Sequence, residues 1–171
     1  MEIFRAIGIN KKEYISFIAE YKPVMYRIAY GYLGDETRSL DAVDEAVYLG
    51  YLNRKKLREP RFLKTWLTRI LINECYRILI ISKREVIMEE MPEEMNPPID
   101  DDSIPIKFAV QSLPEDLRKI IVLRYFGGYT IAETAVILEI PEGTVATRTR
   151  KAMGILRVEL DDEEGGETHV R

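Results

Sequence analysis

The chain has 171 residues and a formal net charge of −4, with 46% hydrophobic and 32% charged residues. This balance excludes a disordered chain, and the longest apolar run, Ile78 to Ile81, is far too short to span a bilayer, so one medium or two small globular domains without membrane insertion are expected. No secretory signal is visible, and the single cysteine, Cys75, excludes an internal disulfide, so the expected location is the cytoplasm.

The first half of the chain is predicted to hold three helices. Apolar side chains at helical spacing predict the first helix over residues 10–33, and Pro23 should kink or divide it. Ser39 is the expected cap of a second helix, whose small apolar face lies opposite an acidic one. A basic connection over residues 53–60 then leads to a long third helix over residues 61–84.

Polar residues on these helices raise the question of a chemical site. Asp41, Asp44 and Glu45 suggest acid–base chemistry or a metal site, but without a histidine nearby a solvated or partner-binding face is the preferred interpretation. Trp66 is interpreted first as core packing. Asn73 lies in an apolar stretch and is expected to be buried and to connect neighbouring helices, because a buried amide needs hydrogen-bond partners. No metal, cofactor or small-molecule substrate is expected.

Charge is distributed unevenly and separates two basic segments. Residues 1–87 carry a net charge of +5 and residues 105–160 one of +2, whereas residues 88–104 carry −7 and residues 161–171 carry −4. The stretch 88–104 also contains three prolines and no base, so it predicts an extended linker between two small helical domains. Because local charge decides whether a surface can meet phosphates, both domains suit nucleic acid despite the negative total.

The second basic segment is predicted to form four helices that end in a helix-turn-helix. One helix is expected over residues 105–112, and Pro114 marks the start of the next, which two glycines end at residues 127–128. The expected inner face of that helix is formed by Leu117, Ile120, Ile121 and Tyr125. Thr130 and Glu133 have the spacing of a capping box and predict a third, short helix.

The last helix, starting at Pro141, has the pattern of a DNA recognition helix. Its expected inner face is formed by Val145, Thr149, Ala152 and Leu156. The opposite face then carries hydroxyl and cationic groups, as a helix in the major groove requires. These outward residues are Thr144, Thr147, Arg148 and Lys151. On these residues alone, an ordinary helical hairpin with a solvated basic face remains an alternative.

Two sets of motifs resemble bacterial sigma factors of the sigma-70 family, in the small two-domain extracytoplasmic-function group. In the second segment the resemblance rests on Leu113-Pro114, Arg118, Leu123 to Phe126, Ala132-Glu133 and Ile140 to Val145. In the first it rests on Asp41 to Ala46 and Lys64 to Asn73. The motifs cover roughly residues 13–158 and imply an all-α fold of two small helical domains.

The resemblance implies a dissociable subunit that binds RNA polymerase core at the clamp of its largest subunits and directs it to promoter DNA. The residues matching the polymerase-binding helix are Asp41, Asp44, Glu45 and Tyr48. Those matching the segment that binds and melts the −10 element are Arg54, Lys55, Lys56, Trp66, Arg69, Asn73 and Arg77. The recognition helix would read the −35 element, with Arg148 as the first contact.

The resemblance further implies an anti-sigma factor, and the apolar run Ile78 to Ile81 is a patch that such a partner could cover. The chain departs from the family pattern at Ala146, where many relatives carry a base, and at Thr149, where they carry an aliphatic residue. The alternative is a helix-turn-helix regulator without initiation activity, which the polymerase-binding motif argues against. An enzyme is not expected, since the single histidine, His169, lies in an acidic tail.

Overall fold

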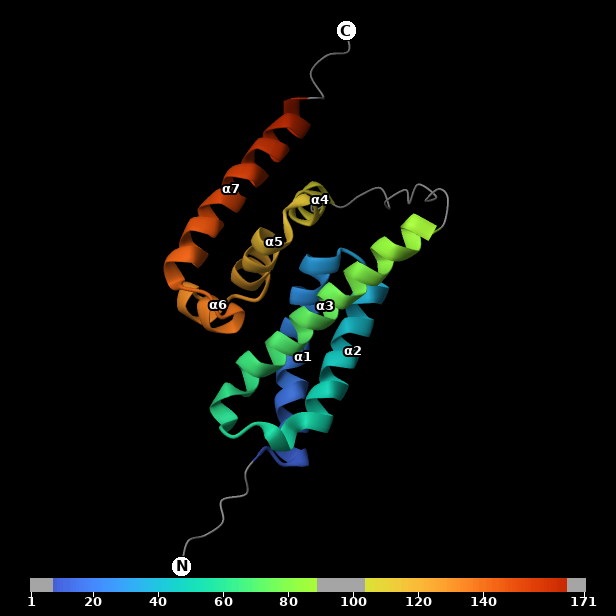
Figure 1. Ribbon diagram of the computed structural model, residues 1–171, viewed down its shortest axis with the longest axis vertical. Coiled ribbons are helices and arrows are strands. Elements are labelled where there is room, and N and C mark those ends of the chain that lie inside the picture. The colour runs from blue at the N-terminus through green and yellow to red at the C-terminus, as the bar shows by residue number, and fades with distance from the viewer. Residues whose placement is uncertain (1–7, 89–103, 166–171) are drawn as a thin grey trace, which may run out of the picture.

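The computed structural model describes residues 8–88 and 104–165, and within these ranges it contains helices and no strand. The predicted all-α fold class is therefore confirmed. The first half comprises α1 (Lys11–Leu33), α2 (Glu36–Asn53) and α3 (Leu63–Met88). The second half comprises α4 (Ile104–Ser112), α5 (Glu115–Ile121), α6 (Ile131–Leu138) and α7 (Glu142–Gly165). Figure 1 shows the two groups side by side, with α6 next to α3 and α7 on the outside.

Helix α1 begins with a capping box, in which the Asn10 side chain accepts from the Glu13 N–H and the Glu13 carboxylate accepts from the Asn10 N–H. The helix is continuous through Pro23, so the predicted division does not occur. Pro23 is exposed, whereas Tyr21 and Met25 on either side are buried, and this packing holds both halves of the helix in place.

Helix α2 begins earlier than predicted. Its cap is Asp35, whose side chain accepts from the Arg38 N–H at 2.7 Å, and not Ser39. Ser39 is fully buried inside the first turn, and its hydroxyl donates back to the Asp35 carbonyl. A carboxylate at the cap also benefits from the positive end of the helix dipole, which a hydroxyl does not.

Helix α3 follows two short 3₁₀ turns, η1 (Arg54–Lys56) and η2 (Pro60–Phe62). Its inner face is fully or nearly buried at Leu63, Leu67, Leu71 and Cys75. Burial raises the pKa of the Cys75 thiol to about 12. Asn73 is exposed, so the prediction of a buried amide is wrong: it lies about 200° around the helix from Leu71 and so faces solvent.

Helix α5 runs directly into a π-helical turn, η3 (Val122–Phe126), in which the Gly127 N–H donates to the Val122 carbonyl at 2.9 Å. The wider turn rotates the residues that follow it. Leu117, Ile120 and Ile121 are buried as predicted, but Tyr125 is 56% exposed, which corrects its assignment to the inner face. A π turn replaces the 3.6-residue period on which that prediction relied.

The two halves share one hydrophobic core. Its largest cluster joins Met25 and Leu71 of the first half to Leu113, Leu123 and Ile137 of the second. The predicted linker, 88–104, lies outside the described residues except at its two ends, while α7 continues to Gly165. Among the residues that the structure describes, no helix is long and apolar enough to cross a membrane.

Candidate nucleic-acid interface

The helix-turn-helix is built by α6, a three-residue turn and α7. The Thr130 side chain accepts from the Glu133 N–H at 3.1 Å, and the Glu133 carboxylate accepts from the Thr130 N–H at 2.8 Å, so the predicted capping box is confirmed. These hydrogen bonds lower the pKa of Glu133 below its ordinary value. Glu139 then reverses the chain in the left-handed conformation, with φ of 56°.

The buried face of α7 orients the predicted recognition residues. Val145, Ala152 and Leu156 are buried, and the Thr149 hydroxyl donates to the Val145 carbonyl at 2.7 Å, which satisfies it without a partner from another element. The four outward residues differ in accessibility. Thr147 and Lys151 are exposed, whereas Thr144 and Arg148 are half-buried.

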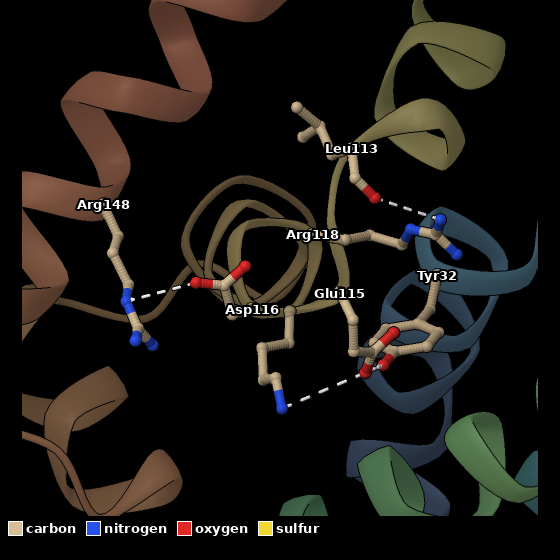
Figure 2. A network of polar contacts seen from close by, with 7 residues as sticks. Tyr32, Leu113, Glu115, Asp116, Arg118 and Arg148 are labelled. Atoms are coloured by element: carbon tan, nitrogen blue, oxygen red, sulfur yellow. Dashed lines mark hydrogen bonds and ion pairs between the residues drawn. The ribbon is translucent and has the colours of Figure 1, made fainter.

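Arg148 forms an ion pair that crosses to α5. Its Nε lies 3.4 Å from Asp116 Oδ2, and the two side chains are 37% and 51% exposed. Figure 2 shows Arg148 extending from α7 towards this carboxylate. Exposed pairs of this kind contribute about 0–1 kcal/mol, so the pair with Asp116 holds Arg148 only weakly.

The neighbouring carboxylate, Glu115, points the other way and meets the first half. It accepts a hydrogen bond from the Tyr32 hydroxyl of α1, and the Lys119 ammonium lies 3.9 Å from it (Figure 2). Burial raises the pKa of Glu115 above its ordinary value, and the nearby Lys119 and Arg118 offset part of that rise. Two adjacent acids on α5 thus connect the recognition helix on one side to α1 on the other.

The basic connection before α3 presents part of the predicted −10 set. Lys55 and Lys56 are exposed. Arg54 is half-buried, donates to the Tyr51 carbonyl at 2.7 Å, and places its guanidinium 4.0 Å from the centre of the Tyr51 ring. Of these three predicted cations the two lysines are the accessible ones, and Arg54 fixes the end of α2.

On α3 the remaining predicted residues, Trp66, Asn73 and Arg77, lie within about 40° of one another around the helix but are spread over about three turns. Trp66 is half-buried and packs on a small cluster with Tyr14 and Leu63, as the core interpretation predicted. Asn73 and Arg77 are exposed, and the Arg77 Nε lies 2.7 Å from Glu74 Oε2. The structure does not bring Trp66, Asn73 and Arg77 into one cluster.

Arg69 is the predicted DNA contact whose surroundings differ most from expectation. Its Nε donates to the Ile137 carbonyl at 3.0 Å, and a second nitrogen donates to the Val136 carbonyl. A third interaction places Arg69 3.3 Å from the Glu139 carboxylate. Arg69 therefore binds the carbonyl end of α6, where helix carbonyls lack partners of their own.

The acidic face of α2 borders two hollows. One, of about 470 Å³, is lined by Asp41, Asp44, Glu45 and Arg77 among others. The second, of about 450 Å³, is mainly apolar and includes Asp44 and Tyr48. Asp44 also binds Lys22 at 2.9 Å. The predicted polymerase-binding residues therefore lie together on one surface.

The apolar part of this surface was not predicted from the sequence. Ile15 and Ile18 of α1 and Val47 and Tyr51 of α2 line the second hollow. Ile15 is 53% exposed. In the sequence, the only signal of this apolar surface is the spacing of two isoleucines, Ile15 and Ile18, three residues apart on the same helix. Within the described residues no group of acids, histidine and cysteine has the geometry of a metal site.

Comparisons with known proteins match both halves of the chain to one family. Residues 17–83 match the model of sigma-70 region 2, and residues 104–156 match that of sigma-70 region 4. The sequence is 26% identical over 153 residues to the RNA polymerase sigma factor SigV of Bacillus subtilis, covering 88% of this chain and 92% of that protein. It is 29% identical over 130 residues to the ECF RNA polymerase sigma-E factor of Escherichia coli, covering 66% and 68%.

Two solved structures share the fold. The sigma factor RpoE in complex with the anti-sigma factor NepR from Bartonella quintana has a TM-score of 0.72 at 22% identity, covering 88% of this chain and 98% of that one. CnrH in complex with the cytosolic domain of CnrY has a TM-score of 0.65 at 19% identity, covering 90% of each chain.

Proposed function

The chain belongs to the sigma-70 family, in its extracytoplasmic-function group, and we propose that its two halves are the two promoter-binding ends of an RNA polymerase sigma factor. A sigma factor binds core polymerase, recognises promoter DNA and directs initiation. The observation that carries the proposal is the succession of region 2 and region 4 in one chain, each folded on its own set of helices. Sigma factors are initiation factors, and we propose that this one catalyses no reaction itself and acts in the cytoplasm.

The second half would bind the −35 element through α7. Thr147 and Lys151 are exposed on the face opposite the core, and Thr144 and Arg148 lie beside them. Arg148 would exchange Asp116 for a guanine edge or a phosphate, since its present ion pair is largely solvated. Ala146 and Thr149 add no positive charge, so binding by this half alone is expected to be weak.

The first half would bind the −10 element and hold its separated strand. The exposed Lys55 and Lys56 would neutralise phosphates and the half-buried ring of Trp66 would stack on a base, the usual means of holding single-stranded DNA. Asn73 and Arg77 lie about two and three turns after Trp66 on the same face of α3 and would extend this contact. Arg54 and Arg69 complete the proposed set, and Arg69 would first have to leave α6.

The acidic surface of α2 would dock on the polymerase clamp. Asp41 and Asp44 are exposed, Glu45 is half-buried, and Tyr48 is 56% exposed beside the apolar hollow. Charges at the rim with an apolar centre suit a protein partner whose own surface is basic at the edge and apolar in the middle.

Control by an anti-sigma factor is supported by the sigma factor RpoE from Bartonella quintana, whose structure was solved in complex with the anti-sigma factor NepR. We propose that the apolar run at the end of α3 takes part, because Ile81 is 41% exposed and Ile80 is half-buried. Replacing both by serine should weaken capture of the anti-sigma factor, and unchanged capture would contradict this assignment.

The proposed function is tested by run-off transcription with purified core polymerase on candidate promoter fragments. Initiation should depend on the protein and should be lost in the Asp41→Lys/Asp44→Lys variant, whose substitutions are exposed and leave the core intact. The matched control is Glu20→Lys, a charge reversal at an exposed position of α1 outside both hollows. Duplex binding without any initiation would instead favour the plain helix-turn-helix regulator.

A further inference from the structure

The residues just before α1 contact η1, the basic turn that follows α2. The Ile9 N–H donates to the Arg54 carbonyl at 3.3 Å, and the Leu57 N–H donates to the same oxygen at 3.4 Å. A carbonyl oxygen has two lone pairs and can accept both. One backbone atom therefore joins the residues before α1 to the turn that carries Lys55 and Lys56. Figure 1 shows the beginning of α1 and the connection between α2 and α3 at the same end of the first half.

The start of α1 fixes the position of Ile9. This residue directly precedes the capping residue Asn10, and it is 3% exposed in a cluster with Tyr14 and Leu63. An apolar residue before the cap that packs with the fourth residue of the helix forms a hydrophobic staple, which sets the direction in which the chain enters the helix. Tyr14 is that fourth residue and belongs to the same cluster as Ile9. The staple therefore holds the backbone of Ile9 beside the first turn of α1.

The cluster around Ile9 also supports both ends of η1. The Tyr14 ring lies 5.9 Å from the Tyr51 ring, measured between their centres, and the Arg54 guanidinium lies 4.0 Å from the centre of the Tyr51 ring. Leu57, at the other end of η1, packs against the cluster, and so does Trp66 of α3. The residues that flank the two lysines are therefore placed by the same apolar cluster.

Gly8 allows the two backbones to approach closely. Its φ is 111°, a value that L-residues with a side chain rarely adopt. A Cβ atom at this position would lie 2.6 Å from the Lys55 Cα and 2.8 Å from the Lys55 carbonyl oxygen. Both are backbone atoms, which cannot rotate aside as the end of a side chain can. A larger residue at position 8 would therefore have to displace η1 or move away from it.

The turn η1 depends on these contacts because it has little structure of its own. It is three residues long, and no side chain caps its start. Short 3₁₀ turns have poor hydrogen-bond geometry. Lys55 and Lys56 are exposed, so the position of their backbone in η1 decides where their charges lie. A turn that is already held before DNA arrives loses less conformational freedom on binding, which favours affinity.

We propose that Gly8 and Ile9 are positioning residues for the −10 contact, which hold η1 so that Lys55 and Lys56 together neutralise phosphates of the separated strand. This inference rests on the proposed function, because it assumes that these two lysines bind DNA. Gly8 and Ile9 lie before residues 17–83, the part of the chain that matches sigma-70 region 2, so the family match does not include them.

Two substitutions disturb the contact in different ways, and each has a matched control. Gly8→Ala adds the Cβ atom that would meet the Lys55 backbone. Its control is Gly128→Ala, which also places a side chain at positive φ, 72°, but meets nothing within 4 Å. Ile9→Ala removes a buried side chain, whereas Ile9→Val keeps most of it and should restore the behaviour of the parent.

The first measurement is amide hydrogen exchange at Leu57 in the full chain without DNA. This N–H shares the Arg54 carbonyl with Ile9, so it reports directly on η1. Gly8→Ala and Ile9→Ala should both speed its exchange, whereas Gly128→Ala and Ile9→Val should leave it unchanged. If neither Gly8→Ala nor Ile9→Ala speeds this exchange, the two residues do not hold the turn and the proposal is overturned.

The second measurement is the salt dependence of binding to a mixed-sequence single-stranded DNA of about twelve nucleotides, between about 50 and 200 mM salt. Each phosphate contact to a single strand contributes about 0.7 to the slope of log affinity against log salt concentration. Lys55→Ala/Lys56→Ala should lower this slope by about 1.4, and Gly8→Ala and Ile9→Ala by about 0.7–1.4. Gly128→Ala and Ile9→Val should match the parent. A merely structural role would reduce the folded fraction and shift affinity equally at every salt concentration, so the slope would not change.

Combining Gly8→Ala with the two lysine substitutions shows whether Gly8 acts through them. If it does, the triple variant has the slope of Lys55→Ala/Lys56→Ala, because effects that share one contact are not additive. A slope lowered further in the triple variant, or an unchanged slope for Gly8→Ala, would overturn the positioning role. An unchanged slope for the lysine variant would overturn it as well, because these lysines would then not contact the strand.

Run-off transcription with the parent chain tests the proposed function separately. A chain that shows the expected slopes but supports no initiation retains the positioning role of Gly8 and Ile9 and contradicts the proposed function. Initiation by the parent together with unchanged slopes for Gly8→Ala and Ile9→Ala retains the proposed function and overturns the positioning role.

Discussion

The two surfaces proposed to bind DNA differ in what covers them. On α7, Thr147 and Lys151 face solvent and Arg148 is held only by a solvated pair within its own half. On α3, Arg69 is bound to backbone carbonyls of the other half and follows the fully buried Thr68. The difference indicates that the proposed −35 surface is accessible in this arrangement of the two halves, whereas Arg69 of the proposed −10 surface is bound by the other half.

The largest expected effect tests whether the two halves unfold as one unit. Leu67→Ala in α3 and Leu117→Ala in α5 each remove a side chain that is at most 1% exposed, which costs about 2–5 kcal/mol of the free energy of unfolding. One core cluster joins both halves, so the chain should unfold in a single cooperative transition, followed by circular dichroism in urea. Each variant should lower the urea concentration at the midpoint of that transition. Two transitions, of which Leu67→Ala moves one, would show that the halves unfold independently.

The second prediction compares the two surfaces directly on duplex DNA that carries the −35 element. Arg148→Ala should lose about 1–3 kcal/mol of binding free energy if Arg148 contacts a base, as measured by fluorescence anisotropy on matched and mutated duplexes. Arg69→Ala should leave this binding unchanged, since Arg69 faces α6.

Lys151→Ala is the matched control for that experiment. Lys151 is exposed on the same face of α7, and as a phosphate contact it should weaken binding equally on all sequences and lower the salt slope by about 1. If Arg148→Ala also weakens binding equally on all sequences, Arg148 contacts a phosphate and not a base.

The third prediction uses the capping boxes that each half contains. Thr130→Ala and Asn10→Ala each remove a side chain that accepts from the N–H three residues later, at a cost of about 0.5–2 kcal/mol. Thr130→Ala should also weaken duplex binding, because α6 supports α7, whereas Asn10→Ala should not. Hydrogen exchange of the first turns of α1 and α6 locates each loss, and protection lost at the distant helix instead would contradict it.

The smallest expected effect is a pH dependence at the Tyr32–Glu115 contact between the halves. The pKa of Glu115 is raised above the ordinary 4.5, so its contribution to stability is fully present below that value and is lost as pH rises through the raised pKa. Glu115→Gln still accepts from the Tyr32 hydroxyl but does not ionise, so it should gain stability relative to the parent as pH rises.

The pKa shift of Glu133 is opposite in sign to that of Glu115, so Glu133 serves as an internal reference. Its pKa is lowered, so its contribution is present above 4.5 and is lost as pH falls through the lowered pKa. Because the parent and Glu115→Gln both keep Glu133, its effect cancels in their difference. A difference in urea midpoint that is flat between about pH 4 and 7 would contradict the role given to Glu115.

Features that depend on residues close together in the sequence could be predicted from it. The cap at Thr130, the inner face of α7 and the two basic segments follow from spacing, and the family resemblance followed from two motifs in order. Asp35 competes with Ser39 for the same cap, and two polar candidates four residues apart are not separated by propensity alone. The exposure of Tyr125 depends on the π turn, which replaces the helical period at that point.

The contact between the two halves could not be predicted from the spacing of residues in the sequence, because it joins residues far apart in the chain. Tyr129 meets Tyr21 across more than a hundred positions, and both look like ordinary core aromatics. Arg69 carries the same charge whether it faces DNA or α6. Only the fold shows that its partners are carbonyl groups of another helix.

The single cysteine has a practical consequence for kinetics. Cys75 is completely buried in α3, and with a pKa of about 12 it carries almost no thiolate at neutral pH, so it should ignore alkylating reagents while α3 stays packed. Cysteines placed on the surface for distance probes therefore need no prior removal of the native one. In the parent chain, the slow rate at which this thiol is alkylated therefore measures how often the first half unfolds locally.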